Sequence, residues 1–398
     1  MQTEKTPRNI DGSFERRERK NANVYLNEYV AYYALNFITK SGLWDKFQSG
    51  GSITLNNDSS KIERGAIEHL DGMGYLFREG QTYTKKLSVK FPTSQQFYNA
   101  KEAVLKMAEF QEKVIRGKAT SVRKQVIESA YPQELIALSG TCLMESSYKD
   151  FLSELYEEYR GVRSDTSTRT QPENAWGAGV MMEPAARRIA AELANYVVFN
   201  KIKNPQILEL GSGNASTLAA ILDEFKAQKL GLPKVLASDK DESTSESARG
   251  LFKKRGYESD FSWRRVDMGD TDDLRKAKRI LGDENVFIHI GYILHESNLL
   301  AERTLNALRK VFPDATFLFT EYYLQDTITS QVPLHFQTIH TLSGQELKSR
   351  SENIDRAKRF GYEPVEGAEI VHNWVEKTGK SGIYREPLNS TILFKFKD

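Results

Sequence analysis

The sequence has little cysteine and no long apolar run. Cys142 is the single cysteine among 398 residues, which excludes an internal disulfide framework and any zinc site built from several cysteines. We therefore expect a protein of a reducing cytoplasm. No run approaches the roughly 18 apolar residues that a membrane-spanning helix requires, and the N-terminus lacks the apolar core of a secretory signal. We expect no membrane partner.

A large excess of one charge is also absent. The 56 basic residues nearly balance the 54 acidic ones, which leaves a net charge of +2. No chain-wide basic field therefore attracts nucleic acid or an anionic membrane surface, and we expect no nucleic-acid partner. The length, with 39% hydrophobic residues, is sufficient for two domains with cores of their own.

Changes of pattern divide the chain into four segments. Residues 1–22 are predicted to form a mobile, charged arm. Residues 23–158 read as a mainly helical domain of winged-helix type, and the polar residues 159–175, which include Pro172, read as a connection. From residue 176 to residue 398, strands alternate with helices. This alternation predicts an α/β fold with a doubly wound, Rossmann-like parallel sheet.

The first domain is predicted from helical spacing and turn residues. Apolar and aromatic residues favour a helix over 24–40, followed by a short second helix. A further helix over 60–72 precedes two short strands at 75–79 and 82–86, which is the order of a winged helix. Because the helix over 24–40 carries more apolar positions than one face of a monomeric helix needs, we expect a homodimer built on it.

The second domain is predicted to contain five strands followed by an antiparallel hairpin edge near the C-terminus. The five predicted strands are QILEL, KVLAS, FSWRRVD, NVFIHIGYIL and ATFLFTEYY. Ligands of such sheets bind outside the carboxyl ends of the strands. The candidate site residues are therefore those at the strand ends.

Two glycines, Gly211 and Gly213, follow the first of these strands and let the backbone approach a ligand closely. A dinucleotide-binding turn would have a third glycine where Ser216 stands. Glu209 lies just inside the turn, where a carboxylate would repel a pyrophosphate but favour a cation. The turn therefore favours a sulfonium amino acid over NAD, with a plain strand-to-helix turn as the structural alternative.

Two more acids end the next strands. Asp239 is placed to accept hydrogen bonds from both ribose hydroxyls of an adenosine, as an acid at this position does in nucleotide-binding sheets. In "VDMGD", Asp267 is a candidate partner for the adenine amino group, and Met268 is a candidate to pack on the ring. Together the three strand ends predict a site for S-adenosyl-L-methionine.

Through "ILELGSGN", "ASDKD" and "VDMGD" the chain resembles the class I S-adenosylmethionine-dependent methyltransferases. With its winged-helix-like first domain it is similar to the O-methyltransferases that act on plant phenolics and microbial natural products. The resemblance implies that residues 176–398 are the methyltransferase domain. It also implies a small-molecule acceptor in secondary metabolism, and a first domain that forms a dimer and contributes to the substrate pocket.

The resemblance also implies a catalytic group. His295, in "YILHES", falls at the family's position for the histidine that removes the acceptor's proton, and a neutral imidazole suits that task. Its neighbour is Glu296, where the family more often has aspartate. Glu321 and Glu346 match the two acids that orient this histidine. The structural alternative is a buried histidine and two solvated helix-end acids.

Aromatic residues near the strand ends are candidates for the substrate pocket. Trp176 and Tyr292 are the two that we retain, since a cation over an aromatic ring gains about 0.5–2 kcal/mol. Most tryptophan and tyrosine side chains simply fill cores, so core packing is the alternative for both.

A different chemistry competes for His295. Four of the six histidines lie between the fourth strand and the segment after the fifth: His289, His295, His335 and His340. Two imidazoles with open coordination positions could hold iron, which would chelate a 2-oxo acid and acidify the adjacent carbon. The related 2-oxo acid C-methyltransferases resemble this arrangement, with His295 and His340 as the ligand pair, His335 in reserve and His289 in the core. Chance clustering is the alternative.

A protein without catalysis is the third hypothesis. A winged helix could read DNA while the second domain senses a ligand. The candidate recognition helix over 60–72 carries three acidic and two basic residues, so it would meet phosphates without net positive charge. This composition disfavours a regulator.

Overall fold

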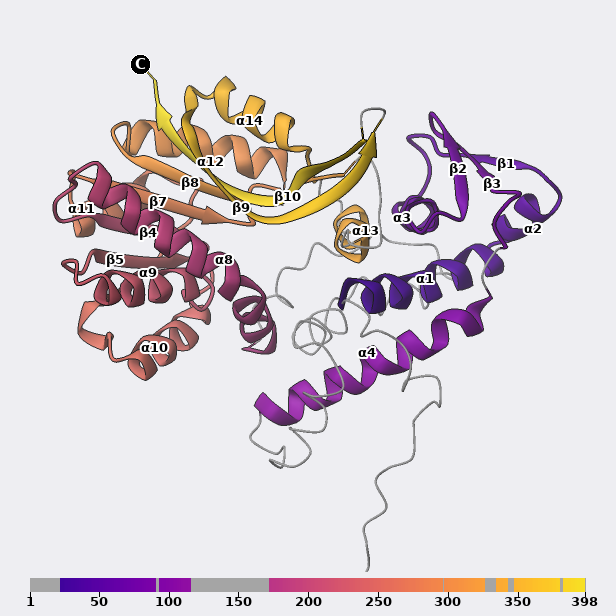
Figure 1. Ribbon diagram of the computed structural model, residues 1–398, viewed down its shortest axis with the longest axis horizontal. Coiled ribbons are helices and arrows are strands. Elements are labelled where there is room, and N and C mark those ends of the chain that lie inside the picture. The colour runs from indigo at the N-terminus through magenta and orange to yellow at the C-terminus, as the bar shows by residue number, and fades with distance from the viewer. Residues whose placement is uncertain are drawn as a thin grey trace, which may run out of the picture.

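The computed structural model describes residues 22–90, 93–115, 172–325 apart from 296, 334–342, 347–379 and 382–397. Two lobes are visible in Figure 1, a sheet-containing lobe and a mainly helical N-terminal lobe. The arm predicted for residues 1–22 lies outside the described residues except for its last residue, as does the predicted connection up to residue 171. None of the helices within the described ranges is long and apolar enough to cross a membrane.

The sheet-containing lobe is built on a seven-stranded sheet with the order β6-β5-β4-β7-β8-β10-β9. Its parallel strands are β4 (Gln206–Leu210), β5 (Lys234–Asp239), β6 (Phe261–Arg265), β7 (Val286–Gly291) and β8 (Thr316–Tyr322). Antiparallel to β8 runs β10 (Gly382–Phe396), which pairs with the edge strand β9 (Tyr362–Gly379). The predicted fold class and the C-terminal hairpin are confirmed.

Helices cover both faces of this sheet (Figure 1). One face packs against α8 (Pro172–Phe199), α9 (Ser216–Ala227) and α10 (Thr244–Arg255), which a short 3-10 turn (Glu258–Asp260) follows. The other face packs against α11 (Thr271–Leu281), α12 (Asn298–Val311) and α14 (Arg350–Arg359). Ile207 and Leu208 of β4 enter opposite cores, because successive strand residues point to opposite faces. The apolar runs of the sequence thus become strands buried on both sides.

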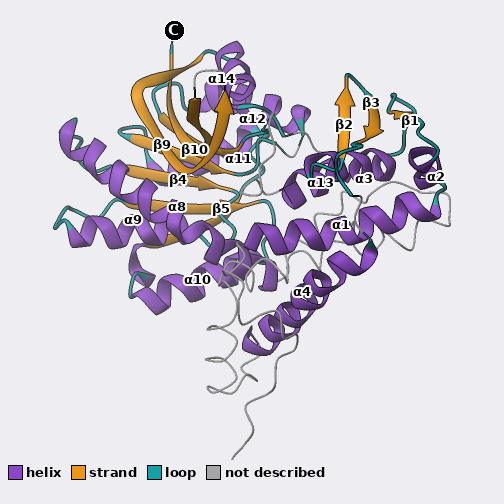
Figure 2. Cartoon of the chain, turned by 45° about the vertical axis from the view of Figure 1, so that its right-hand side comes forward, coloured by secondary structure: helices purple, strands orange, loops and turns teal. Residues whose placement is uncertain are grey.

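The N-terminal lobe contains the helices and strands predicted for residues 24–86, whereas residues 116–158 of the predicted domain lie outside the described residues. In chain order the described elements of this lobe are α1 (Ala22–Lys40), α2 (Leu43–Gln48), β1 (Ser52–Thr54), α3 (Lys61–Gly72), β2 (Leu76–Glu79), β3 (Thr82–Lys85) and α4 (Ser94–Ile115). The strands form an antiparallel sheet in the order β1-β3-β2 (Figure 2). The assignment of this lobe as a winged helix stays a prediction.

Local chemistry explains where α3 begins and how α1 is buried. The side chain of Ser60 accepts the backbone N–H of Glu63 and so caps the first turn of α3. Tyr29, Val30 and Ala34 of α1 are buried in a core that α3 and α4 share. The apolar positions that suggested a dimer are thus mostly covered within one chain, and the homodimer stays a prediction.

The helix α13 (Leu334–Leu342) links the two lobes. It follows β8 in the chain but packs against α1 and α3 (Figure 1). His69 of α3 lies 2.6 Å from the hydroxyl of Thr338 through Nδ1 and 2.9 Å from the carbonyl oxygen of Asn27 through Nε2. Burial lowers the pKa of His69 to about 4. A neutral ring therefore donates to the carbonyl oxygen of Asn27 through Nε2–H. At Nδ1 it accepts the hydroxyl hydrogen of Thr338, which is shared with the carbonyl oxygen of Leu334 at 3.0 Å.

Candidate cofactor and catalytic site

The candidate site lies at the carboxyl ends of the parallel strands. From β4 the sheet continues through β5 to β6 on one side, and through β7 to β8 on the other. The order of strands therefore reverses between β4 and β7, which is where open α/β sheets bind their ligands. The turns after β4, β5, β6 and β7 carry the residues that the sequence predicts for the cofactor.

The turn after β4 requires glycine for two separate reasons. Gly211 and Gly213 have φ angles of 66° and 51°, in the left-handed region that favours glycine. A Cβ atom on Gly211 would also lie 1.9 Å from Cδ1 of Ile293 and 3.5 Å from Cε of Met268. The neighbour that requires glycine at position 211 is thus the side chain of Ile293, which sequence reasoning missed, and the close approach of a ligand to this turn stays a prediction.

Asp239 is tied to the glycine turn by hydrogen bonds. Its Oδ2 accepts the backbone N–H of Gly213 at 3.1 Å, and its Oδ1 accepts that of Asp241 at 3.0 Å. Burial raises the pKa of this carboxyl group, and the two backbone hydrogen bonds oppose that shift. The carboxylate thus holds the ends of β4 and β5 together, and its role toward a ribose stays a prediction.

The turn after β6 brings the third predicted segment to the site. Asp267 accepts the backbone N–H of Gly269 at 2.9 Å through Oδ1. Met268 is buried and lies against the glycine turn, as its contact with the Cβ position of Gly211 shows. The segments predicted to surround the adenosine are therefore neighbours in the fold.

Glu209 is buried, with 4% of its surface exposed. Its Oε1 lies 2.9 Å from Nδ1 of His289 in the neighbouring strand β7. Its Oε2 is buried and has no hydrogen-bond partner among the described residues. A buried carboxylate oxygen without a partner is costly unless a donor reaches it. Two residues before the glycine turn, this oxygen fits a cationic ligand group better than a phosphate.

His295 and Glu321 form the contact that the sequence predicted for them. Nδ1 of His295 lies 2.7 Å from Oε2 of Glu321, and Oε1 of Glu321 accepts the backbone N–H of Leu294 at 2.7 Å. Both side chains are buried. An ionised carboxylate only accepts hydrogen bonds, so the ring hydrogen is on Nδ1 and the lone pair is on Nε2.

The other residues predicted around His295 have separate outcomes. Glu296 and Glu346 lie outside the described residues, and the side chain of Trp176 in α8 is not described. The hydroxyl of Tyr292 accepts from Nδ2 of Asn389 at 2.8 Å, and its ring centroid lies 4.9 Å from that of Tyr322. Burial raises the pKa of Tyr292 well above its ordinary value. Its place in a substrate pocket stays a prediction.

The fold brings His340 to His295. Their ring centroids are 4.5 Å apart, and both rings are buried. His340 belongs to α13, so the helix that links the lobes also reaches the catalytic candidate. The side chain of His335, on the same helix, is not described. Within the described ranges, no three histidine, cysteine, aspartate or glutamate side chains converge as metal ligands.

Arg356 of α14 is a residue that sequence reasoning missed. It is 2% exposed, and its guanidinium donates to the carbonyl oxygen of Leu294 at 2.9 Å and to Oδ1 of Asn353 at 2.6 Å. It lines a small cavity together with Glu321. Burial lowers the pKa of Arg356, and the charge of Glu321 opposes that shift. The guanidinium therefore stabilises the turn that carries His295.

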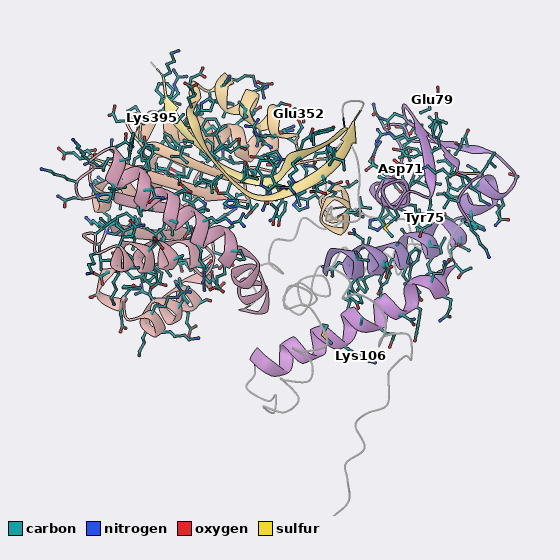
Figure 3. The ribbon with its side chains drawn as sticks, in the orientation of Figure 1. Asp71, Tyr75, Glu79, Lys106, Glu352 and Lys395 are labelled. Carbon is teal, nitrogen blue, oxygen red and sulfur yellow. The ribbon has the colours of Figure 1, made fainter. Side chains whose placement is uncertain are left out.

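The sequence around Arg356 does not indicate that this side chain is buried. Its helix reads RSENIDRAKR and resembles a solvated surface helix. The helix begins with a capping box between Ser349 and Glu352. Glu352 is exposed and is labelled on α14 in Figure 3. Only the short apolar spacing of Ile354 and Ala357 could have marked a buried face.

A groove between α8, α9 and α10 lies away from these catalytic candidates. It reaches Asn214 and Ser216 at the start of α9. Two of its cations are already paired within the groove, Arg255 with Asp223 and Arg187 with Glu183. The groove therefore has fewer unpaired charges to bind a charged ligand than its residue types suggest.

Comparison with known proteins gives a fold and no sequence family. No family model matches the sequence, and no curated protein matches it. The fold is similar to that of an O-methyltransferase family 2 protein from Planctomyces limnophilus, solved in complex with apigenin. That similarity has a TM-score of 0.50 and 11% identity over 94% of this chain and 95% of that one.

Two further solved structures are similar over most of the chain. An O-methyltransferase family protein from Burkholderia thailandensis has 12% identity, covers 93% of this chain and 95% of its own, and gives a TM-score of 0.46. The CMeT domain of the citrinin polyketide synthase has 15% identity, covers 93% and 88%, and gives a TM-score of 0.49. With the sheet order described above, the Planctomyces similarity confirms the predicted Rossmann-like methyltransferase fold.

Proposed function

We propose that the chain is an enzyme that transfers the methyl group of S-adenosyl-L-methionine to a small-molecule acceptor. The observation that carries this proposal is the turn at Gly211 and Gly213, which directly follows β4 and whose Gly213 N–H donates to Asp239, together with the buried Oε2 of Glu209, which has no hydrogen-bond partner among the described residues. A sulfonium amino acid joined to an adenosine needs that set of groups. The proposed cofactor residues are Glu209, Gly211, Gly213, Asp239, Asp267 and Met268.

His295 is the proposed general base for O-methylation. When bound, the cofactor supplies a methyl group on a positively charged sulfur that departs as a neutral thioether. Nε2 of His295 takes the acceptor's hydroxyl proton while the oxygen–carbon bond forms and the carbon–sulfur bond breaks. Glu321 holds Nδ1–H and stabilises the ring as it becomes positively charged. Alignment of acceptor and methyl group contributes the rest.

The fold comparison supports a class of acceptor. The Planctomyces protein is named as an O-methyltransferase and was solved with apigenin, which supports a natural-product acceptor with a hydroxyl group. Trp176 and Tyr292 are the proposed pocket residues, and Glu346 is proposed as a second acid that orients His295.

We also propose a cytoplasmic homodimer built on the N-terminal lobe. Light scattering at micromolar concentration should give the mass of two chains.

Iron-assisted C-methylation of a 2-oxo acid is a second candidate function. The observation that favours it is the 4.5 Å separation of the His295 and His340 rings. These two side chains would hold the iron, with Nε2 of His295 as the ligand atom because Nδ1 is held by Glu321. The metal would supply Lewis acidity to the acceptor. His335 remains the reserve ligand, and no third ligand is placed by the described residues.

A DNA-reading regulator is less well supported. In a winged helix of this kind α3 would enter the groove of DNA, yet α3 packs against α1 and α13. Arg64 of α3 is moreover paired with Glu68, at 3.6 Å. A helix with one face covered and its arginine paired with an acid offers little positive charge to phosphates.

One assay tests the proposed function and separates its two forms. The full chain is incubated with S-adenosylmethionine carrying a labelled methyl group and with phenolic, aliphatic hydroxyl and 2-oxo acid acceptors, before and after metal removal by a chelator. O-methylation predicts transfer to a hydroxyl acceptor that survives the chelator. Transfer to a 2-oxo acid alone, lost with the chelator and restored by iron, would support the second candidate. Failure of the protein to bind the cofactor would contradict both.

A further inference from the structure

A chain of buried hydrogen bonds crosses five neighbouring strands of the large sheet. It starts at Glu209 in β4, whose Oε1 lies 2.9 Å from Nδ1 of His289 in β7. Nε2 of His289 lies 3.0 Å from the hydroxyl of Thr320 in β8, which lies 2.6 Å from that of Thr391 in β10. The chain ends at Nε2 of His372 in β9, 2.8 Å from Thr391. All five side chains are buried.

Glu209 and His289 together set the direction of the hydrogens in this chain. The carboxylate of Glu209 accepts from Nδ1 of His289, and Nε2 of the His289 ring, in its neutral form, accepts from Thr320. The single hydrogen of Thr320 is then used, so Thr320 accepts from Thr391. Thr391 in turn accepts from Nε2–H of His372. Each hydrogen therefore points toward Glu209, and hydrogen bonds aligned in this way strengthen one another.

The far end of the chain is compatible with this direction. Burial lowers the pKa of His372 to about 4, with the nearby charge of Arg188 acting in the same sense. His372 is therefore neutral and carries one ring hydrogen. Arg188 of α8 donates to the carbonyl oxygens of Val371 and His372 and so fixes the backbone at this end.

We propose that His289 is a positioning residue for the cofactor, which holds Glu209 by Oε1 so that Oε2 is left for the ammonium group of the cofactor's amino-acid part. This inference rests on the proposed function. Thr320 and Thr391 fix the orientation of the imidazole ring, because the hydroxyl of Thr320 donates to Nε2 of His289. The proposed methyl transfer at His295 uses none of the side chains of this chain, which come from β4, β7, β8, β10 and β9.

Two ligands separate the amino-acid part of the cofactor from its adenosine part. S-adenosylhomocysteine carries the ammonium group, whereas 5′-methylthioadenosine shares the adenosine and the thioether but lacks the amino acid. Isothermal titration of the full chain with each ligand gives the ratio of the two dissociation constants. A general loss of folding would weaken both ligands, while a loss at Glu209 would weaken only the first.

Three substitutions at one position test the proposal. His289→Leu removes both ring nitrogens and should weaken S-adenosylhomocysteine about tenfold, as expected for a lost hydrogen bond to a charged group, with methylthioadenosine unchanged. His289→Asn places an amide donor near the position of Nδ1 and should restore most of the affinity. His289→Gln places its amide near Nε2, toward Thr320, and should not. If the leucine variant fails to fold, the asparagine and glutamine variants carry the comparison alone.

The outcomes are distinguishable from those of the proposed function. A wild-type chain that binds neither ligand contradicts the proposed function and this inference with it. A wild-type chain that binds both, with the same ratio of dissociation constants in all variants, overturns the inference alone. So does rescue by glutamine but not by asparagine, because the contact to Thr320 would then matter and the contact to Glu209 would not.

Discussion

The carboxylate of Glu321 lies 2.7 Å from Nδ1 of His295 and so places the ring hydrogen on Nδ1 and the lone pair on Nε2. The same carboxylate accepts the backbone N–H of Leu294. Glu321 therefore joins the end of β8 to the turn after β7 at the residue next to His295, the proposed base. A side chain held in this way is pre-organised for proton transfer at Nε2.

Loss of the base should slow turnover without loss of cofactor binding. We expect His295→Ala to lower kcat by the ~10²–10⁴ typical of a lost general base. Glu321→Gln should lower kcat by less, because the ring remains but its tautomer is no longer fixed. Steady-state kinetics with a hydroxyl acceptor measures both, and titration with S-adenosylhomocysteine is the control. A His295→Ala enzyme with nearly wild-type kcat would show that another group accepts the proton.

Arg356 should contribute to stability through the turn that carries His295. Arg356→Met removes the donor to the carbonyl of Leu294 and the cation beside Glu321. We expect a loss of about 2–4 kcal/mol in the free energy of unfolding, as for other buried charges left unpaired. Arg359→Met, an exposed arginine of the same helix, is the matched control and should change it by less than about 0.5 kcal/mol. Equal stabilities of the two variants by urea denaturation would contradict this role.

The contact between the lobes should be sensitive to acid. The pKa of His69 is about 4 in the folded chain against 6.5 for an ordinary histidine. Between about pH 4 and pH 6.5, His69 is therefore protonated in the unfolded chain but neutral in the folded chain. Stability contributed by the neutral ring is complete above pH 6.5 and falls as the pH drops toward 4, by up to about 1.4 kcal/mol per pH unit.

Removing the titrating group tests this pH dependence. His69→Gln keeps polar atoms for Thr338 and Asn27 but cannot be protonated in this range. The slope of the unfolding free energy between pH 4 and 6.5 should decrease accordingly. His372, whose pKa is also about 4, keeps its own share of the slope in the variant. An unchanged slope would mean that His69 is protonated in the fold or already neutral in the unfolded chain.

The sequence predicted the sheet well because buried parallel strands leave a local signal. QILEL and VFIHIG are apolar runs bounded by turn residues, and both become strands of the sheet. The placement of Asp239, Gly211 and Gly213 near one another was also predictable, because the carboxyl ends of parallel strands meet at one edge of the sheet. Such features depend on residues close together in the chain.

Contacts between distant segments were not predictable in the same way. His289 faces Glu209 because β4 and β7 pair in that register, and a shift by one residue would turn one of the two side chains to the other face. The sequence of α13 does not indicate that this helix packs on α3. The approach of His340 to His295 was therefore expected only from the family resemblance. Arg356 was hidden in a helix whose composition is that of an exposed surface.

The central claim is that this chain binds S-adenosylmethionine at the carboxyl ends of β4 and β5, and one titration tests it most directly. S-adenosylhomocysteine is titrated into the full wild-type chain, into Asp239→Ala and into Asp260→Asn, an exposed carboxylate just before β6. The account predicts one site per chain in the wild type, unchanged affinity in Asp260→Asn, and at least about tenfold weaker binding in Asp239→Ala, which loses a charged acceptor at the proposed ribose position. No binding by the wild-type chain at high micromolar ligand, or equal binding by all three proteins, would contradict it.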